Sequence, residues 1–161
     1  MSDESLLCTA CGLCCTGALH DAALLGEDEV ETAKAIGLPV LPSAPSPRFA
    51  LPCPKLEGAT CTIYDARPRV CAAYACQLLH DVRGGRPLAS ALEIVGEGRR
   101  LAETLRQFMP SGETFADSRA QLFNRGRPAA AQLSSLALTH YLDRHFRNRN
   151  EGPLLSSEPT Q

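Results

Sequence analysis

Eight cysteines, all within the first 76 residues, constrain this chain more than any other feature of its sequence. In a secreted chain such a set would indicate a disulfide framework, whereas in a reducing cytosol clustered cysteines indicate metal ligands or catalytic thiols. The N-terminus, Met-Ser-Asp-Glu-Ser, has neither the basic nor the apolar region of a secretory signal. We therefore expect a cytoplasmic protein that binds metal through Cys8, Cys11, Cys14, Cys15, Cys53, Cys61, Cys71 and Cys76.

The spacing of the first cysteines favours metal binding. Two residues separate Cys8 from Cys11, and two more separate Cys11 from Cys14. One short loop can therefore wrap a single ion or cluster. The 8 thiols divide into two sets of four, enough for two Cys₄ zinc sites or for two four-thiolate iron–sulfur clusters. The pattern leaves the choice between zinc and iron open.

Cys15 needs a separate explanation because it directly follows Cys14, and neighbouring side chains usually diverge. It could join a second site with Cys61, Cys71 and Cys76, or it could bridge two ions. Cys71 and Cys76 are five residues apart, which is about 140° around an ideal helix. Both can bind one metal only if the helix ends or turns between them.

A long segment without cysteine separates residues 8–15 from residues 53–76. A site that uses both groups must be closed by bringing them together. We predict that the two groups meet in one cluster region, and that at least one sulfur of the second group lies within about 4 Å of a sulfur of the first.

The cysteines also lie in an ordered series of short motifs. These are Cys8-Thr-Ala-Cys11-Gly-Leu-Cys14-Cys15, Cys53-Pro54-x-Leu56, Cys61-Thr-Ile63-Tyr64-x-x-Arg67-Pro68-x-x-Cys71 and Tyr74-x-Cys76. The series resembles the YkgJ-type CxxCxxCC cysteine-cluster family, whose members are described as zinc- or iron-chelating domains and sometimes as iron–sulfur oxidoreductases. The resemblance implies metal chelation by the cysteines and specifies no reaction.

Charge and motif content exclude several other functions. The net charge is −2 and the isoelectric point about 6.1, so the chain lacks the basic footprint of a nucleic-acid-binding protein. No apolar run approaches the roughly 18 residues of a membrane-spanning helix. The sequence contains no P-loop, G-x-G-x-x-G or HExxH motif and no paired carboxylate pattern. We assign no catalytic residue, and whether the protein is an enzyme stays open.

The cysteine-containing half has few signals for regular structure. A short helix is predicted over Glu27–Ile36, with acidic residues in its first turn. Residues 39–54 contain six of the twelve prolines and are predicted to be irregular. Another helix is predicted to begin near Asp65 and to run through Cys71 and Tyr74.

Helical patterns dominate the rest of the chain. Apolar residues recur at helical spacing over 88–105 and 129–146 and more weakly over 112–123. Gly96 and Gly98 weaken the middle of the first segment and could mark a bend. The side chains expected to be buried are Leu92, Val95, Leu105, Leu133 and Leu136.

Three other side chains near the cysteines have competing interpretations. Arg67 could offset the negative charge of a tetrathiolate site, or it could cap a helix at the surface. Tyr64 is expected to pack beneath a loop rather than to bond a thiolate. His20 is a conceivable metal ligand, but we expect a solvated loop histidine.

The sequence thus predicts a small, mainly α protein. A loop-rich cysteine metal module, residues 1–82, packs against two or three helices in residues 83–150, and a flexible tail covers residues 151–161. Three functions are compatible with this organisation. The metal could be structural, with the helical part as a docking surface for a protein partner; the protein could be an iron–sulfur redox or electron-transfer protein; or it could be a metal-binding accessory of a protein-modifying enzyme.

Overall fold

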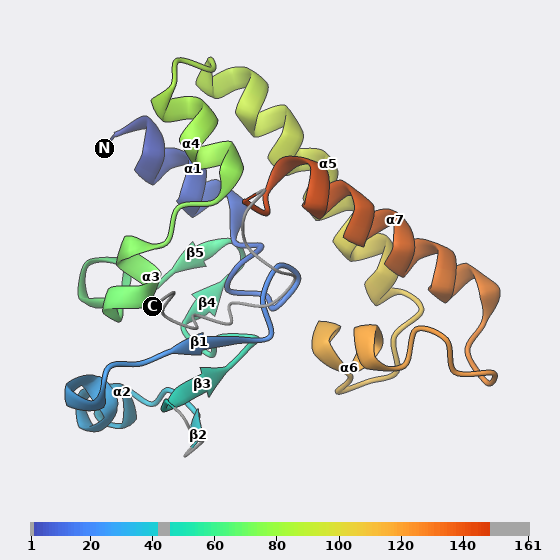
Figure 1. Cartoon of the computed structure of the whole chain (residues 1–161), viewed down its shortest axis with the longest axis horizontal. Helices are drawn as coiled ribbons and strands as arrows, with labels where there is room; N and C mark the ends of the chain where they lie inside the picture. The colour runs from blue at the N-terminus through green and yellow to red at the C-terminus, as the bar shows by residue number, and fades with distance from the viewer. Residues whose placement is uncertain (1, 42–45, 149–161) are drawn as a thin grey trace, which may run out of the picture.

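The computed structural model describes residues 2–41 and 46–148. The long helices α5 (Leu88–Arg106) and α7 (Ala129–His145) lie together on one side, and the short strands lie on the other (Figure 1). The predicted mainly helical composition is confirmed, since the described residues form seven α-helices and only short strands. None of these helices has the length and apolar character needed to cross a membrane. The predicted tail over 151–161 lies outside the described residues.

The described chain opens with helix α1 (Asp3–Cys11). The Ser2 hydroxyl accepts a hydrogen bond from the Ser5 N–H at 3.2 Å, and acidic residues occupy the first turn, both of which favour a helix start. Gly12 ends the helix with a φ of 66°, which glycine adopts without strain. A Cβ at Gly12 would lie 3.1 Å from the Ala59 backbone, so only glycine fits between this turn and the segment around Ala59.

Three short strands form an antiparallel sheet in the order β1–β3–β2: β1 (Ala22–Leu24), β2 (Val40–Leu41) and β3 (Arg48–Ala50). The side chain of Phe49, on the central strand, is almost fully buried. The prediction that residues 39–54 are wholly irregular is therefore wrong. The strands form because Pro39 and Pro47 precede β2 and β3 and do not interrupt them, and proline is tolerated at the start of a strand.

The helix predicted over Glu27–Ile36 is confirmed in shortened form. A 3₁₀ turn, η1 (Glu27–Glu29), leads into α2 (Val30–Ala35). Gly37 follows with a φ of 79°, and its N–H donates to the Lys34 carbonyl at 2.9 Å. The left-handed glycine ends the helix as the sequence predicts.

The segment that carries the later cysteines is built from three small elements. Strands β4 (Leu56–Glu57) and β5 (Thr60–Cys61) pair as a hairpin, and a 3₁₀ turn and a short helix follow: η2 (Tyr64–Ala66) and α3 (Arg69–Ala73). The single helix predicted from Asp65 to Tyr74 is wrong, because Arg67 is extended with a ψ of 151°. A residue that precedes proline disfavours the helical region, so Pro68 separates the two pieces.

The remaining helices largely follow the sequence prediction. Helix α4 (Gln77–Arg83) precedes α5, and the helix predicted over 112–123 is confirmed only as α6 (Phe115–Ala120). Helix α5 is unbroken at the two glycines expected to weaken it. A Cβ on Gly98 would lie 3.1 Å from Leu13 Cδ1, so this glycine lets the N-terminal loop pack closely on α5.

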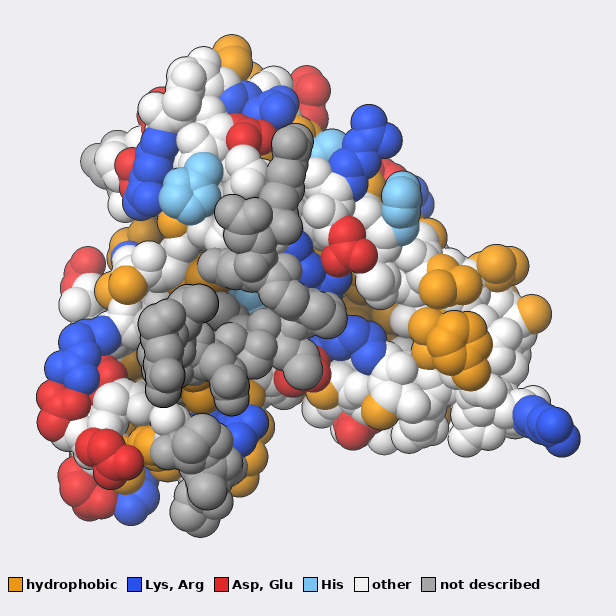
Figure 2. Space-filling view, viewed as in Figure 1, with side chains coloured by type: hydrophobic (Ala, Val, Ile, Leu, Met, Phe, Trp, Pro, Cys, Tyr) orange, Lys and Arg blue, Asp and Glu red, His pale blue; other side chains and the backbone are white. Residues whose placement is uncertain are grey.

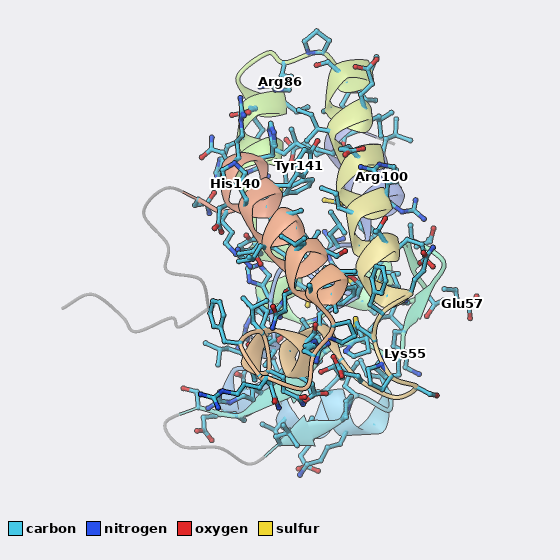
Figure 3. All side chains as sticks on the ribbon, turned by 90° about the vertical axis from the view of Figure 1, so that its right-hand side faces the viewer. Lys55, Glu57, Arg86, Arg100, His140 and Tyr141 are labelled. Carbon is cyan, nitrogen blue, oxygen red and sulfur yellow. The ribbon has the colours of Figure 1, made fainter. Side chains whose placement is uncertain are left out.

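The packing of α7 on α5 is visible in a second view. Tyr141 lies between the two helices (Figure 3), and its hydroxyl donates to the Ile94 carbonyl at 3.2 Å. The buried face of α7 consists of Ala131, Ser135, Leu138 and Leu142. The small side chains of Ala131 and Ser135 keep the first part of this face flat.

Two of the five side chains predicted to be buried are buried, namely Val95 and Leu105. The other predictions are wrong, because Leu133 is 67% exposed, Leu136 44% and Leu92 36%. Leu133 and Leu136 lie outside the buried face of α7, whose leucines are Leu138 and Leu142. Figure 2 shows hydrophobic side chains gathered around the right-hand end of α7.

The buried apolar residues form two separate clusters. The larger core joins α1, α4, α5 and α7 and includes Leu7, Leu13, Leu78, Leu105 and Leu142. The smaller core lies beside the three-stranded sheet and consists of Ala23, Leu25, Ala33, Leu38, Phe49 and Leu51. Residues 1–76 therefore contribute to both cores, and their first part packs with the long helices.

Candidate metal centre

All eight cysteines line one cavity of about 230 Å³, and each is a free thiol: Cys8, Cys11, Cys14, Cys15, Cys53, Cys61, Cys71 and Cys76. The cavity wall includes residues of α1, β5 and α3. The prediction that residues 8–15 and 53–76 meet in space is confirmed, because both groups line this cavity. The predicted sulfur–sulfur distance of about 4 Å stays a prediction.

The first cysteines reach the cavity through α1 and the turn after it. Cys8 and Cys11 are three residues apart in α1 and so lie on one side of the helix. After Gly12 the chain folds back tightly, with the Thr16 N–H donating to the Gly12 carbonyl at 2.9 Å. This turn presents Cys14 and the residue after it to the cavity.

The later cysteines arrive on separate elements. The Cys53 N–H donates to the Cys15 carbonyl at 2.8 Å, which joins the two groups directly through the backbone. Cys61 ends β5 and Cys71 lies in α3. Cys76 is the N-cap residue of α4. The thiols therefore depend on the tertiary fold, and not on one local loop, for their convergence.

The chain turns between Cys71 and Cys76, as one shared site would require. Helix α3 ends at Ala73, and Tyr74 is extended with a ψ of 129°. The two thiols therefore do not follow the 140° separation of one continuous helix. The turn therefore removes the helical constraint on which other thiols each of the two cysteines can join.

Burial dominates the electrostatics of the thiols. It raises the pKa of Cys11 and of Cys71 to about 12, that of Cys15 to about 11, and that of Cys14 well above its usual range. Repulsion from neighbouring thiolates adds to each of these pKa increases. Without a cation the buried thiols hold their protons at neutral pH, so a bound metal ion would have to displace them.

Arg67 is the basic residue that faces several of these thiols. Its guanidinium carbon lies 3.7 Å from the centroid of the Tyr64 ring, and both side chains line the cavity. Its positive charge lowers the pKa of Cys8, Cys15 and Cys71 against the dominant effect of burial. Tyr64 thus packs beneath an arginine, and Arg67 is placed to offset thiolate charge.

His20 is buried, and the prediction of a solvated loop histidine is wrong. Its side chain lies in the cavity wall with its ring edge-on to Tyr74, at 4.8 Å between centroids. Neither ring nitrogen has a hydrogen-bond partner among the described residues. Burial lowers the pKa of His20 to about 4, so the imidazole is neutral. The only sequence signal for this burial is the apolar pair Ala18-Leu19 immediately before it.

The donor chemistry of the cavity fits zinc or iron, although its thiols do not form a closed ligand shell. Across residues 2–41 and 46–148, no three His, Cys, Asp or Glu side chains are arranged to hold a metal ion. Thiolates are nonetheless the ligands that structural zinc and iron–sulfur clusters use. A cavity lined by eight unpaired thiols defines a cysteine-cluster domain.

Comparison with known proteins agrees with this class. The chain belongs to the CxxCxxCC family, whose description is "putative zinc- or iron-chelating domain", and the match covers residues 7–87. This confirms the family resemblance expected from the motifs. The match includes every cysteine and ends one residue before α5 begins. Comparison with curated proteins and with solved structures gives no match.

Proposed function

We propose that this protein chelates zinc or iron in the cytoplasm through its eight cysteine thiols. One observation carries the proposal: cysteines from α1, the following turn, the hairpin segment, α3 and the start of α4 all line one cavity. A disulfide framework would pair such thiols, whereas here each is free. Free thiols gathered from distant segments serve metal chelation better than any other chemistry on this chain.

The residues around the cavity have distinct tasks in chelation. The thiols supply the ligands, and each must lose its proton on binding, so burial makes metal binding strongly dependent on pH. Arg67 offsets part of the negative charge that four thiolates and a divalent ion leave behind. Bound zinc would cross-link the segments, and a bound iron–sulfur cluster would add electron transfer.

The iron–sulfur alternative has one specific observation in its favour. The run Cys8-x₂-Cys11-x₂-Cys14 with a separate Cys53-Pro54 is shared in outline with bacterial ferredoxins. The fourth cysteine, Cys53, lies much farther from the first three than the fourth cysteine of the ferredoxin motif does. The likeness therefore concerns the cysteine ligands and not the conformation of the loop that carries them. An iron–sulfur protein purified without oxygen is brown, whereas a zinc protein is colourless.

The direct experiment is metal analysis of protein purified anaerobically from cells not overloaded with zinc. We expect a fixed amount of zinc or iron per chain, with an absorption spectrum that separates the two. A Cys8→Ser, Cys71→Ser variant should lose metal. The matched control is Thr9→Ala, which removes a polar group from the same cavity wall without removing a thiol. Wild-type protein without bound metal would contradict the proposal.

A helical docking surface for a protein partner stays a prediction. The exposed leucines of α7, Leu133 and Leu136, are the side chains that such a partner would cover. A pull-down that compares the proteins captured by wild type and by the Leu133→Ser variant would test this prediction. Equal capture by wild type and variant would remove α7 from consideration.

A further inference from the structure

We propose that metal binding draws the eight cysteines, which do not form a closed ligand shell in this structure, into two separate four-thiol sites, each for one metal centre. The first tetrad is Cys8, Cys11, Cys14 and Cys76, and the second tetrad is Cys15, Cys53, Cys61 and Cys71. The inference rests on the proposed function, because it assigns ligands within the same cavity. It differs from one of the two alternatives that the sequence left open, in which Cys15 shares a site with Cys61, Cys71 and Cys76.

Five of the eight cysteines divide between the two cores of the protein in the same way. Cys11, Cys14 and Cys76 pack against the larger core, beneath the long helices. Cys53 and Cys71 pack against the smaller core, beside the three-stranded sheet. The thiols therefore enter the cavity from two sides. A site built from one side draws its ligands from elements that already pack together.

The first tetrad is held by the contact between α1 and α4. Arg83 of α4 donates to Glu4 of α1 at 2.7 Å, and the two helices pack along each other. Cys76, at the N-cap of α4, therefore comes near the α1 face that carries Cys8 and Cys11.

The second tetrad is held by the backbone link between Cys15 and Cys53. Their 2.8 Å hydrogen bond fixes the two residues beside each other. The β4–β5 hairpin then returns the chain so that Cys61 follows, and α3, which contacts β1, carries Cys71. Cys53 and Cys71 therefore lie beside the smaller core. The hairpin pairs Cys61 with Leu56, three residues after Cys53, although β5 also contacts α1.

Electrostatic neighbours follow the same division. The thiolates that raise the pKa of Cys71 are those of Cys15, Cys53 and Cys61, which are the other three members of the second tetrad. For Cys11 they are Cys76 and Cys8, both in the first tetrad. The electrostatic interactions across the division are those of Cys15 with its chain neighbour Cys14 and with Cys8.

The adjacent pair Cys14-Cys15 is thus the point where the two sites meet. Consecutive residues send their side chains to different sides, so each can serve one tetrad while the backbone joins them. Arg67 faces both, since its charge acts on Cys8 of the first tetrad and on Cys15 and Cys71 of the second. One arginine therefore offsets charge at both sites.

The sharpest test compares two double variants that differ only in this adjacent pair. Cys14→Ser, Cys76→Ser removes two ligands of the first tetrad, whereas Cys15→Ser, Cys76→Ser removes one ligand from each. Each protein is loaded with Zn²⁺ and challenged with a chelator that leaves wild type loaded. We expect the first variant to retain half of the wild-type zinc and the second to retain almost none. Equal zinc in the two variants, or the reverse order, would overturn the division.

A second measurement uses wild-type protein and so does not depend on the folding of variants. Zinc is removed in steps, exposed thiols are alkylated, and the labelled cysteines are mapped in the species that has lost half its zinc. We expect four labels that make up one complete tetrad. Labels that mix members of both tetrads in every half-loaded species would contradict the proposal. Wild type that binds no zinc or iron at all would instead contradict the proposed function.

Discussion

The region around the larger core and the region around the smaller core are built in different ways. Helices α5 and α7, with 19 and 17 residues, satisfy their own backbone hydrogen bonds and bury a continuous apolar face. The smaller core is enclosed by strands of two or three residues and by the six-residue helix α2. Elements this short are marginal alone, so this region depends on other links for its stability.

The difference between the two regions indicates which part of the chain a bound metal would stabilise. Leu7 and Leu13 belong to the larger core, so α1 and its following turn pack with the long helices. Residues 21–73 contain the smaller core and three members of the second tetrad. Dependence on metal is therefore expected to be greatest in residues 21–73, and not to be uniform over the cysteine-containing half.

Removal of metal should have the largest effect. A structural zinc site contributes about 10 kcal/mol or more to folding. After complete chelation we expect amide hydrogens in residues 21–73 to exchange rapidly, while α5 and α7 keep their protection and most of the helical circular dichroism remains. Restoring the metal should restore protection. Unchanged exchange in residues 21–73 after verified metal removal would mean that the two regions do not differ in this way.

A matched pair of substitutions on α7 should show the strength of the larger core. Leu142 is 1% exposed and Leu133 is 67% exposed. Leu142→Asp buries an unpaired charge and should cost about 4 kcal/mol of unfolding free energy, whereas Leu133→Asp should change it by less than about 0.5 kcal/mol. Urea denaturation of the metal-loaded proteins measures both. Equal destabilisation would mean that the assigned face of α7 is wrong.

His20 should make the stability depend on pH. The pKa of His20 is about 4 in the folded protein, against an ordinary value of 6.5 that applies to the unfolded chain. As the pH falls, the unfolded chain therefore takes up a proton at this residue before the folded protein does, and the folded state loses stability. The wild type should therefore lose roughly 3 kcal/mol between pH 6.5 and pH 4 through this residue. His20→Phe keeps an aromatic ring against Tyr74 and removes this loss. The free energy of unfolding of both proteins is measured at each pH, and the difference between them cancels any effect of metal release that they share. A difference that does not change with pH would contradict the prediction.

Arg67 should have a smaller effect, on metal affinity. Arg67→Gln removes the charge that lowers the pKa of Cys8, Cys15 and Cys71, so protons compete better for the thiols. We expect about tenfold weaker binding, the usual scale for residues that support metal ligands. Arg69→Gln is the control, because Arg69 pairs with Asp28 at the exposed surface. Competition with a chromophoric chelator measures both, and equal affinities would assign Arg67 a packing role only.

The helices that could be predicted are those with a long periodic pattern. The spans of α5 and α7 follow from their spacing, but the packed face of α7 does not. Each face of α7 carries two leucines, so apolar spacing alone does not identify the face with Leu138 and Leu142 as the buried one. Strand β3 was not predictable, because a strand of three residues carries too little pattern.

The gathering of the eight cysteines in one region was predictable, but their proposed division was not. Cysteine count, spacing and motif order indicate eight thiols in one region. Their assignment to tetrads depends on which helix contacts which, such as α1 with α4, and no spacing rule contains that information. His20 was missed for a similar reason, since its contact with Tyr74 joins residues 54 positions apart in the chain.

X-ray absorption at the edge of the metal found in the anaerobically purified protein tests the central claim most directly. If the cysteine cavity binds the metal, the first coordination shell should consist of sulfur, with four sulfurs at about 2.3 Å in the case of zinc. The Cys14→Ser, Cys76→Ser variant should show the same shell at half the signal. A shell dominated by oxygen or nitrogen would contradict chelation by the cysteines.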